Sequence, residues 1–142
     1  MCQILNETPA NKYDIPFKQI AGAIQEYATS SKSEILTLLQ QLAFSYMIGN
    51  ADHHAKNISL IWNPNETVTV SPAYDVISTL PYRHHDQYMV IPLQGKNMNF
   101  KAATFIATGT QYGIPERATQ SMLQKLTKKA EPWIAKLNQL PY

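Results

Sequence analysis

The sequence contains a single cysteine, Cys2, so it cannot form an internal disulfide. This scarcity favours a reducing, cytoplasmic location. The sequence also lacks any apolar run that approaches the roughly 18 residues required by a membrane-spanning helix. Its first residues have neither the basic start nor the apolar stretch of a signal peptide. We therefore expect a cytoplasmic protein that is not secreted and does not cross a membrane.

Charged residues are also scarce, at 15% of the 142 residues, whereas 44% are hydrophobic. A chain of this length buries about 68 to 70% of its unfolded surface, which is enough for one core without a disulfide or a structural metal. We therefore expect a single domain over residues 1–142.

The charge is unevenly distributed along the chain. Residues 1–95 hold five basic and eight acidic residues, whereas residues 96–142 hold seven and two. A basic segment of this kind can attract phosphate or nucleic acid. Its lysines, however, are spaced as on a helix and have no interleaved aromatic residues, which is typical of a solvated helix face. We therefore expect contact with nucleic acid only indirectly, through a partner.

Apolar residues at helical spacing predict two helices in the first third of the chain. The first follows Pro16 and covers residues 17–28. The second begins at Ser31, where S-K-S-E resembles a capping box in which Ser31 and Glu34 each satisfy a backbone N–H. It is apolar almost all round, which is typical of a buried central helix. Gly49 is placed to end it in the left-handed conformation.

The remainder of the chain contains one clear hairpin signal and further helical patterns. Two β-prone runs at residues 58–62 and 67–70 flank a four-residue turn. A third β-prone run covers residues 88–93, and helical patterns cover residues 100–112, 115–129 and 132–140. The expected fold class is therefore mainly α (α+β), with one small β-hairpin.

The segment from residue 48 to residue 57, I-G-N-A-D-H-H-A-K-N, is unusually polar for its place between a buried helix and a strand. It holds Asp52 and Asn57, and Asp75 follows just beyond the hairpin. Phosphoryl transfer from ATP needs a carboxylate to orient the acceptor hydroxyl and oxygen ligands to hold Mg²⁺. The order D-x-x-x-x-N, hairpin, D matches the kinase layout of catalytic loop and metal-binding aspartate.

These residues belong to longer motifs. The segment 48–57, followed by S-P-A-Y-D-V-I-S at 71–78, closely resembles the carboxy-terminal domain of the HipA-like serine/threonine kinases. These are bacterial toxin kinases of toxin–antitoxin pairs. M-C-Q-I-L at the start and I-P-L-Q-G-K-N at 91–97 are also similar to that family, so the resemblance spans nearly the whole chain.

The resemblance implies roles for individual residues. Asp52 matches the catalytic base, and Asn57 and Asp75 match the residues that hold Mg²⁺. His54 and Lys56 match loop positions near the ATP phosphates, where Lys56 would also take part in catalysis. The position before the metal-binding aspartate, also assigned to nucleotide binding, is Tyr74. The implied fold is the helical carboxy-terminal lobe of a protein-kinase-like fold, with the hairpin after the catalytic loop.

Parts of the general kinase pattern are missing. Asn50 and Ala51 stand before Asp52 in place of His-Arg, and Asp75 lies in Tyr-Asp-Val in place of Asp-Phe-Gly. None of the five glycines forms a phosphate loop, and there is no strand lysine or adenine-binding hinge. We therefore expect a carboxy-terminal lobe without its amino-terminal nucleotide lobe, inactive by itself: an excised domain, a split-gene product or a degraded relative.

Two function classes follow. The favoured one is a kinase lobe that transfers the γ-phosphate of ATP to a Ser or Thr hydroxyl of a protein, such as a translation factor, once the missing lobe is supplied. The alternative is a non-catalytic module that binds an antitoxin or a partner kinase.

Each site residue also has an alternative interpretation. Asp52 could cap the loop, Asn57 could pair with the turn backbone, Asp75 could be a turn residue, and Lys56 could be only a solvated charge. A metal hydrolase is a further alternative, because Asp52 and the two histidines after it resemble the D-H-H signature of manganese phosphoesterases, with a second cluster at residues 83–86. The long helix predicted before that triplet argues against it.

Overall fold

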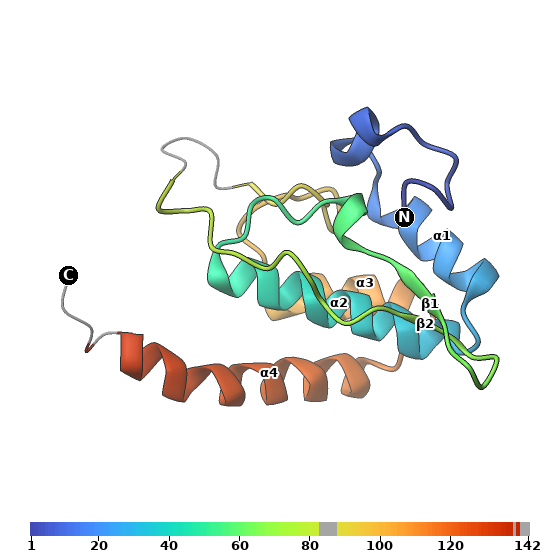
Figure 1. Ribbon diagram of the computed structural model, residues 1–142. Coiled ribbons are helices and arrows are strands. Elements are labelled where there is room, and N and C mark those ends of the chain that lie inside the picture. The colour runs from blue at the N-terminus through green and yellow to red at the C-terminus, as the bar shows by residue number, and fades with distance from the viewer. Residues whose placement is uncertain (83–87, 138, 140–142) are drawn as a thin grey trace.

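The computed structural model describes residues 1–82, 88–137 and 139 (Figure 1). Helices dominate it, and a single antiparallel pair of strands forms the sheet of the described residues. The elements in chain order are the 3-10 helix η1 (Pro9–Tyr13), α1 (Phe17–Tyr27), α2 (Ser31–Ile48), the 3-10 helix η2 (Ala55–Asn57), β1 (Leu60–Trp62), β2 (Val68–Val70), α3 (Ala102–Gln111) and α4 (Glu116–Leu137). This confirms the expected mainly helical fold with one small hairpin.

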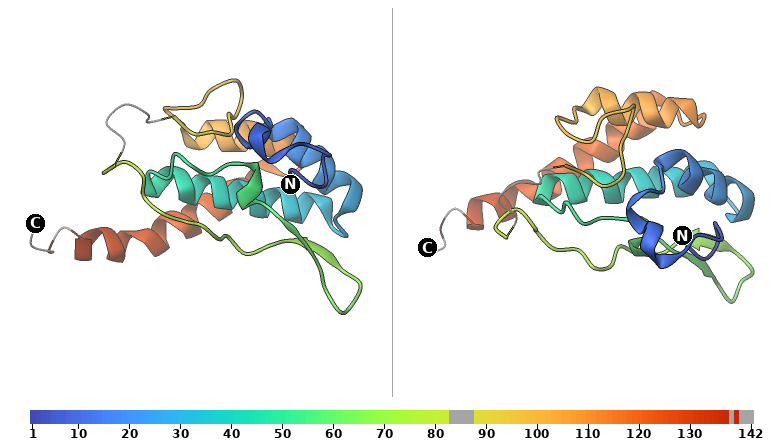
Figure 2. Two further views of the ribbon diagram at one scale, coloured as in Figure 1. Left: turned by 45° about the horizontal axis from the view of Figure 1, so that its top comes forward. Right: turned by 90° about the horizontal axis from the view of Figure 1, so that it is seen from above.

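The central element is α2, which packs against α1, α3, α4 and β2 (Figures 1 and 2). Its Leu38, Leu39 and Leu42 are fully buried, as expected for a helix that is apolar almost all round. Gly49 ends the helix at φ 69°, and its N–H donates to the carbonyls of Ser45 and Tyr46. The predicted stop is therefore confirmed, and it sets the direction in which the polar loop leaves the helix.

The predicted capping box at the start of α2 is wrong. The N-cap residue is Ser30, and it makes no side-chain capping bond. Glu34 instead accepts a hydrogen bond from the backbone N–H of Val70 at 2.7 Å. The carboxylate therefore satisfies a backbone donor of β2 and ties the central helix to the hairpin.

The hairpin has the predicted position, with Leu60 opposite Val70 and Trp62 opposite Val68. Beyond the strands, the N–H of Ser71 donates to the carbonyl of Ser59 at 2.8 Å, so the chain segments that enter and leave the hairpin lie side by side. The residues after β2 are thereby brought back to the loop that precedes β1.

The third β-prone run is not a strand. Met89, Ile91 and Leu93 are buried in alternation, which is the strand-like pattern that the sequence shows. Within residues 1–82 and 88–137, however, the run has no partner strand, and its one ladder-type pairing joins Leu93 to Lys96. The alternation of residue types in this run therefore reflects the burial of every second side chain and not pairing with a strand.

The two helices predicted at 115–129 and 132–140 are one continuous helix, α4, which contains Pro132. Residues 138 and 140 of the predicted second helix lie outside the described residues. A proline usually ends or kinks a helix because it lacks the N–H and its ring meets the preceding turn. Pro132 does not end α4, which continues to Leu137.

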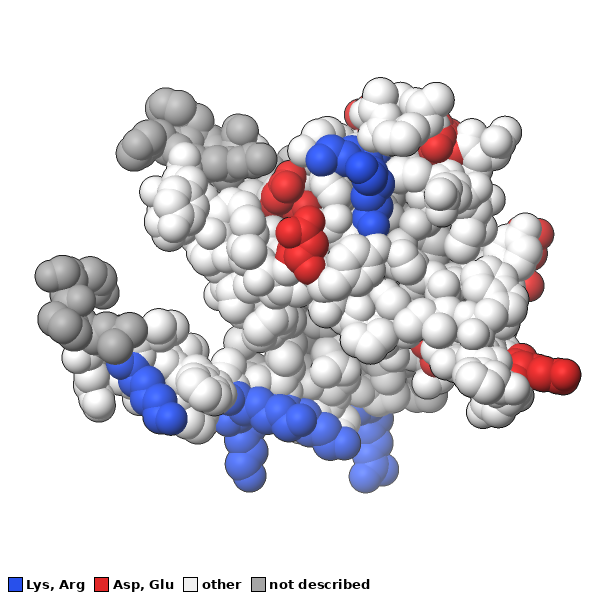
Figure 3. All heavy atoms as spheres, viewed as in Figure 1, with Lys and Arg blue, Asp and Glu red and all other residues white. Residues whose placement is uncertain are grey.

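The first half of α4 buries Thr119 and Met122, while the second half leaves Trp133 and Leu137 exposed. Basic side chains follow the helix in a row on the face shown in Figure 3. The lysines of α4 are Lys125, Lys128, Lys129 and Lys136, and all are exposed, as a solvated helix face requires.

Among the described residues, no helix has both the length and the hydropathy to cross a bilayer.

Candidate functional site

The polar loop begins where α2 ends, and side chains hold its backbone in place. Asn50 is fully buried, and its Oδ1 accepts the N–H of Asp52 at 3.0 Å. The N–H of Ala51 donates to Oγ1 of Thr79 at 2.9 Å, and the N–H of Thr79 returns a bond to the carbonyl of Gly49. Residues from both sides of the hairpin therefore fix the backbone on which Asp52 sits.

Asp52 and Asn57, which the sequence pairs at a spacing of five, are in direct contact. The side-chain amide nitrogen of Asn57 donates to the main-chain carbonyl of Asp52 at 3.3 Å. Asn57 lies in η2 and is only 4% exposed. This bond is the pairing with the turn backbone that was the alternative interpretation of Asn57. It uses the nitrogen of the side-chain amide. A metal ion would use the amide oxygen.

Asp75 reaches the same loop through its neighbour Tyr74. The Tyr74 hydroxyl donates to the carbonyl of Lys56 at 2.5 Å and also lies 2.8 Å from Oγ of Ser59. Asp75 itself is exposed and has a φ of 55°, a left-handed conformation that costs a non-glycine residue energy. Backbone strain of this kind clusters at functional sites, where the surroundings hold it in place.

The two carboxylates act on a common neighbour, the imidazole of His54. Burial lowers the pKa of His54, which is 4% exposed, and the Lys12 ammonium acts in the same direction. The carboxylates of Asp52 and Asp75 both act in the opposite direction and raise this pKa. Asp52 and Asp75 therefore each lie near enough to His54 to influence its pKa.

The neighbouring His53 has no exposed surface. Burial is the main cause that lowers its pKa to about 4, with a smaller contribution from His54, and Asp75 opposes the shift. Neither ring nitrogen has a hydrogen-bond partner in the described part of the chain. His53 is therefore a neutral imidazole at physiological pH.

The structure places Lys56 on the surface, and Tyr74 uses its main-chain carbonyl. The exposed ammonium is compatible both with a phosphate contact and with the solvated charge considered as the alternative. The predicted nucleotide-binding residue Tyr74 is 40% exposed, and its hydroxyl is engaged in joining the two segments of the site.

Sequence reasoning missed one contact with the site. Tyr13, in η1, donates its hydroxyl to Oδ1 of Asp52 at 3.0 Å. Helical and strand periodicities give no signal for such a contact, because it joins a 3-10 helix to a loop 39 residues away.

Two of the predicted site residues, Asn57 and Asp75, carry oxygen atoms of the kind that bind Mg²⁺. No group of three His, Cys, Asp or Glu side chains in residues 1–82 and 88–137 could hold a metal. The D-H-H triplet at residues 52–54 therefore forms no such group there, and the second cluster at residues 83–86 lies outside the described residues. Mg²⁺ is usually held by one or two carboxylates together with phosphate oxygens and waters. The role of Asn57 and Asp75 as ligands of Mg²⁺ stays a prediction.

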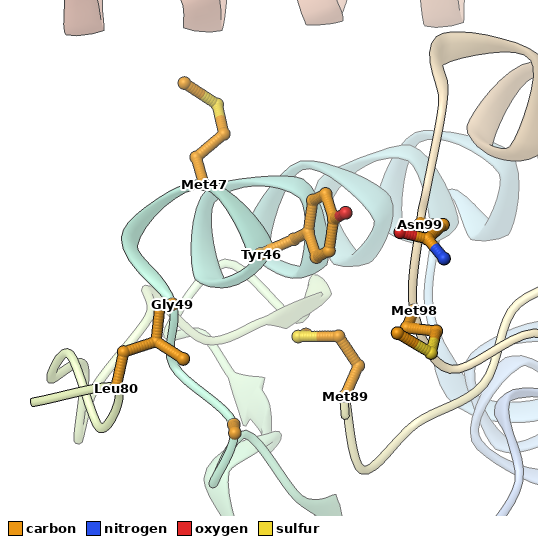
Figure 4. A pocket seen from close by; sticks show the side chains of 8 residues that line it. Tyr46, Met47, Gly49, Leu80, Met89, Met98 and Asn99 are labelled. Carbon is orange, nitrogen blue, oxygen red and sulfur yellow. The ribbon is translucent and has the colours of Figure 1, made fainter. Parts of the chain in front are cut away.

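A hollow of about 410 Å³ lies next to the loop and not at these carboxylates. Its lining includes Ala51, and Figure 4 shows Gly49 and Leu80 on one side and Met89 and Met98 on the other. Figure 4 shows that Met47 points away from these two methionines. The hollow is mainly apolar and contains neither Asp52 nor Asp75, so it is distinct from the candidate site.

The comparisons with known proteins define the family. The model of the HipA-like C-terminal domain matches residues 1–134. The chain therefore belongs to the HipA-like C-terminal domain family, as the motifs around Asp52 and Asp75 indicate.

Relatives and a solved structure agree with this assignment. A protein of Sinorhizobium fredii named "Putative kinase Y4dM" is 39% identical over 80 residues, which cover 56% of this chain and 19% of that protein. A "Putative kinase" of Haemophilus influenzae is 26% identical over 105 residues, which cover 72% of this chain and 30% of that protein.

The solved structure is HipA of Shewanella oneidensis in a complex of HipA, HipB and operator DNA. It matches 99% of this chain with a TM-score of 0.77 at 22% identity, and it confirms the fold. The chain spans 37% of that HipA chain. The present chain therefore spans only part of the length of each of these proteins.

Proposed function

We propose that this chain is the carboxy-terminal catalytic lobe of a HipA-like protein kinase, and that it transfers the γ-phosphate of ATP to a Ser or Thr hydroxyl of a protein. The main support is the Tyr74 bond, which holds the segment of Asp75 against the loop that carries Asp52 and Asn57. This contact brings together the two chain segments that carry Asp52, Asn57 and Asp75.

The residues divide the chemistry between them. Asp52 orients the acceptor hydroxyl and takes its proton as the oxygen attacks phosphorus. Asn57 and Asp75 hold Mg²⁺, which neutralises charge on the phosphates when bound. We assign Lys56 and His54 to nucleotide binding because the family resemblance places them near the phosphates, and the Lys56 side chain is exposed, as a phosphate contact requires. His54 is largely uncharged at neutral pH because burial lowers its pKa, so it contributes hydrogen bonding and not charge.

The nucleotide requires more than this chain supplies. The sequence has no glycine-rich phosphate loop and no adenine hinge. We propose that an amino-terminal lobe, on the same or a separate chain, closes over the phosphates. In that assembly a toxin role and an antitoxin partner follow by analogy with the HipA–HipB complex, where contact with DNA would be made through the partner.

A non-catalytic module remains the second candidate. The observation that favours it is the bond from the Asn57 side chain to the carbonyl of Asp52, because this bond gives Asn57 a structural role in the loop. Such a module would bind an antitoxin or a partner kinase through the same fold.

Two substitutions at the site distinguish these functions. The chain is combined with the amino-terminal lobe of a relative, and transfer of labelled phosphate and Mg-ATP affinity are measured. Asp52→Ala should abolish transfer and leave Mg-ATP affinity nearly unchanged, because the base acts on the acceptor hydroxyl. Asp75→Ala should weaken Mg-dependent binding itself, because a metal ligand is lost.

Glu131→Ala is the matched control, because this exposed carboxylate lies on α4. Transfer that is equal in the parent and in both site variants would favour the non-catalytic module. Loss of folding in both variants would assign the loop residues a structural role only.

A further inference from the structure

The amino-terminal segment is attached to the candidate site along its length. The amino group of Met1 donates to the carbonyls of Ala55 and Ile58, at 3.1 and 2.6 Å. Farther along the segment, η1 packs against η2, the short helix that carries Asn57. Figures 1 and 2 show this segment beside the loop in each view. Residues before α1 are therefore part of the surroundings of Asp52.

Within this segment, Tyr13 makes separate contacts through its hydroxyl and its ring. The hydroxyl donates to Oδ1 of Asp52 at 3.0 Å. The ring meets the imidazole of His54 edge to face, with centroids 5.2 Å apart and planes at 67°. The Lys12 ammonium lies 4.5 Å from the centroid of the same ring. The phenol is therefore fixed by three neighbours, and two of them are residues of the proposed site.

The contact with Tyr13 gives the buried imidazole of His54 an aromatic neighbour. His54 is 4% exposed, and its Nδ1 has no hydrogen-bond partner among the described residues. An edge-to-face contact between two rings favours one orientation of each ring over others. The hydroxyl bond does the same for the carboxylate of Asp52, because a donor at Oδ1 favours a particular rotation of that group.

We infer that Tyr13 is a positioning residue of the candidate site, whose hydroxyl orients the carboxylate of Asp52 and whose ring places His54. The part that concerns phosphoryl transfer rests on the proposed function. In a competing interpretation, the Tyr13 hydroxyl occupies the position at Asp52 where the Ser or Thr hydroxyl of the protein substrate would bind. That interpretation predicts the opposite change in rate, because removal of the hydroxyl would then free the base.

The first test needs no activity and uses the chain alone. Histidine ring resonances are recorded by NMR, and His54 is assigned with a His54→Gln variant. Tyr13→Leu should shift the His54 ring resonances, because the neighbouring aromatic ring is removed, whereas Tyr13→Phe should leave them close to the parent. A Tyr13→Leu spectrum with unshifted His54 resonances would overturn the ring part of the inference.

The second test measures phosphate transfer after the amino-terminal lobe has been supplied. Tyr13→Phe should lower kcat by about three- to tenfold, as expected for one lost orienting hydrogen bond, with KM for ATP unchanged. Tyr13→Leu should lower kcat and also raise KM for ATP, because His54 is no longer held. The control is Tyr27→Phe, which removes the hydroxyl of a similarly exposed tyrosine on α1 and should behave like the parent.

The outcomes separate this inference from the proposed function. A parent that transfers no phosphate contradicts the proposed function, and the His54 spectrum still decides whether Tyr13 places that imidazole. An active parent with an unchanged or faster Tyr13→Phe variant overturns the positioning role of the hydroxyl and leaves the proposed function intact.

Discussion

Tyr74 donates its hydroxyl to the main-chain carbonyl of Lys56 at 2.5 Å, and this bond joins the segment of Asp75 to the loop of Asp52. The Tyr74 oxygen also lies 2.8 Å from Oγ of Ser59, where the hairpin begins. One phenol therefore connects the two chain segments that carry the candidate site. Tyr74, which the family resemblance assigns to nucleotide binding, therefore also holds these two segments together.

Tyr74→Phe tests that task. Loss of the hydroxyl should lower the free energy of unfolding by about 1 kcal/mol, the usual net value of a hydrogen bond. It should also weaken Mg-ATP binding in the presence of the amino-terminal lobe, because Asp75 is no longer held against the loop. Urea unfolding and calorimetry measure the two effects. Tyr82→Phe is the control, because Tyr82 is 83% exposed, and equal behaviour of the two variants would contradict the role of Tyr74.

A second prediction concerns the glycine that directs the loop away from α2. Gly49 and Gly113 have nearly the same φ, 69° and 70°. An added Cβ would overlap the side chain of Leu80 at Gly49, whereas at Gly113 it would meet only the flexible end of Lys32. Gly113→Ala should therefore cost about 1 kcal/mol of stability for the left-handed backbone alone.

Gly49→Ala should cost about 1 kcal/mol more than Gly113→Ala, because Leu80 must also move and give up packing. Urea unfolding of both variants gives the comparison. Equal losses would show that Leu80 adapts freely and that the turn is held by its backbone bonds alone.

The sequence predicts those parts of the fold that depend on local pattern. The bounds of α2, the left-handed stop at Gly49 and the hairpin follow from periodicity and turn residues, and the structure agrees. The partner of Glu34 could not be predicted, because a backbone donor on β2 replaces the local one. The continuous α4 could not be predicted either, since the sequence does not show how a helix accommodates Pro132.

The candidate site likewise contains residues that the sequence predicts and a residue that it does not. Asp52, Asn57 and Asp75 are predicted because the motifs around them are specific, and the Asn57 bond joins the first two, while their roles stay predictions. Tyr13 is not identifiable, because its contact with Asp52 depends on how the segment before α1 folds back over the loop. Contacts between irregular segments leave no periodic signal in a sequence.

A third prediction follows from the buried imidazole of His53. Burial lowers its pKa in the folded protein to about 4, below its ordinary value of 6.5. Between these values the unfolded chain binds a proton that the folded protein does not, so stability falls as the pH falls from 6.5 toward 4. Each pH unit within this window should cost roughly 1.4 kcal/mol. Above pH 6.5 this effect should vanish.

His53→Gln provides the test, because it removes the titrating group from the same buried position. Urea unfolding between pH 5 and pH 7 should show a loss of about 2 kcal/mol in the parent that is clearly smaller in the variant. The comparison uses the pH dependence within each protein, so a general destabilisation by the substitution does not affect it. An equal slope in both proteins would show that His53 is not the group responsible.

The last prediction concerns the chain without an added lobe. Catalysis of phosphoryl transfer consists mainly of positioning and charge stabilisation, and the proposed function assigns metal ligands and a base to this chain but no phosphate loop. Titration calorimetry with Mg-ATP should therefore give a dissociation constant no tighter than about 0.1 mM, equivalent to roughly −5.5 kcal/mol, and labelled ATP should give no phosphorylated product. The residual affinity should depend on Mg²⁺ and should fall in Asp75→Ala but not in Glu131→Ala, because only Asp75 belongs to the proposed metal site. Micromolar binding, or autophosphorylation by the chain alone, would mean that residues outside the loop and the Asp75 segment complete a nucleotide site within these 142 residues. The apolar hollow beside Gly49 would then be the first place to search for the adenine, because it is adjacent to the loop and is lined by methionines.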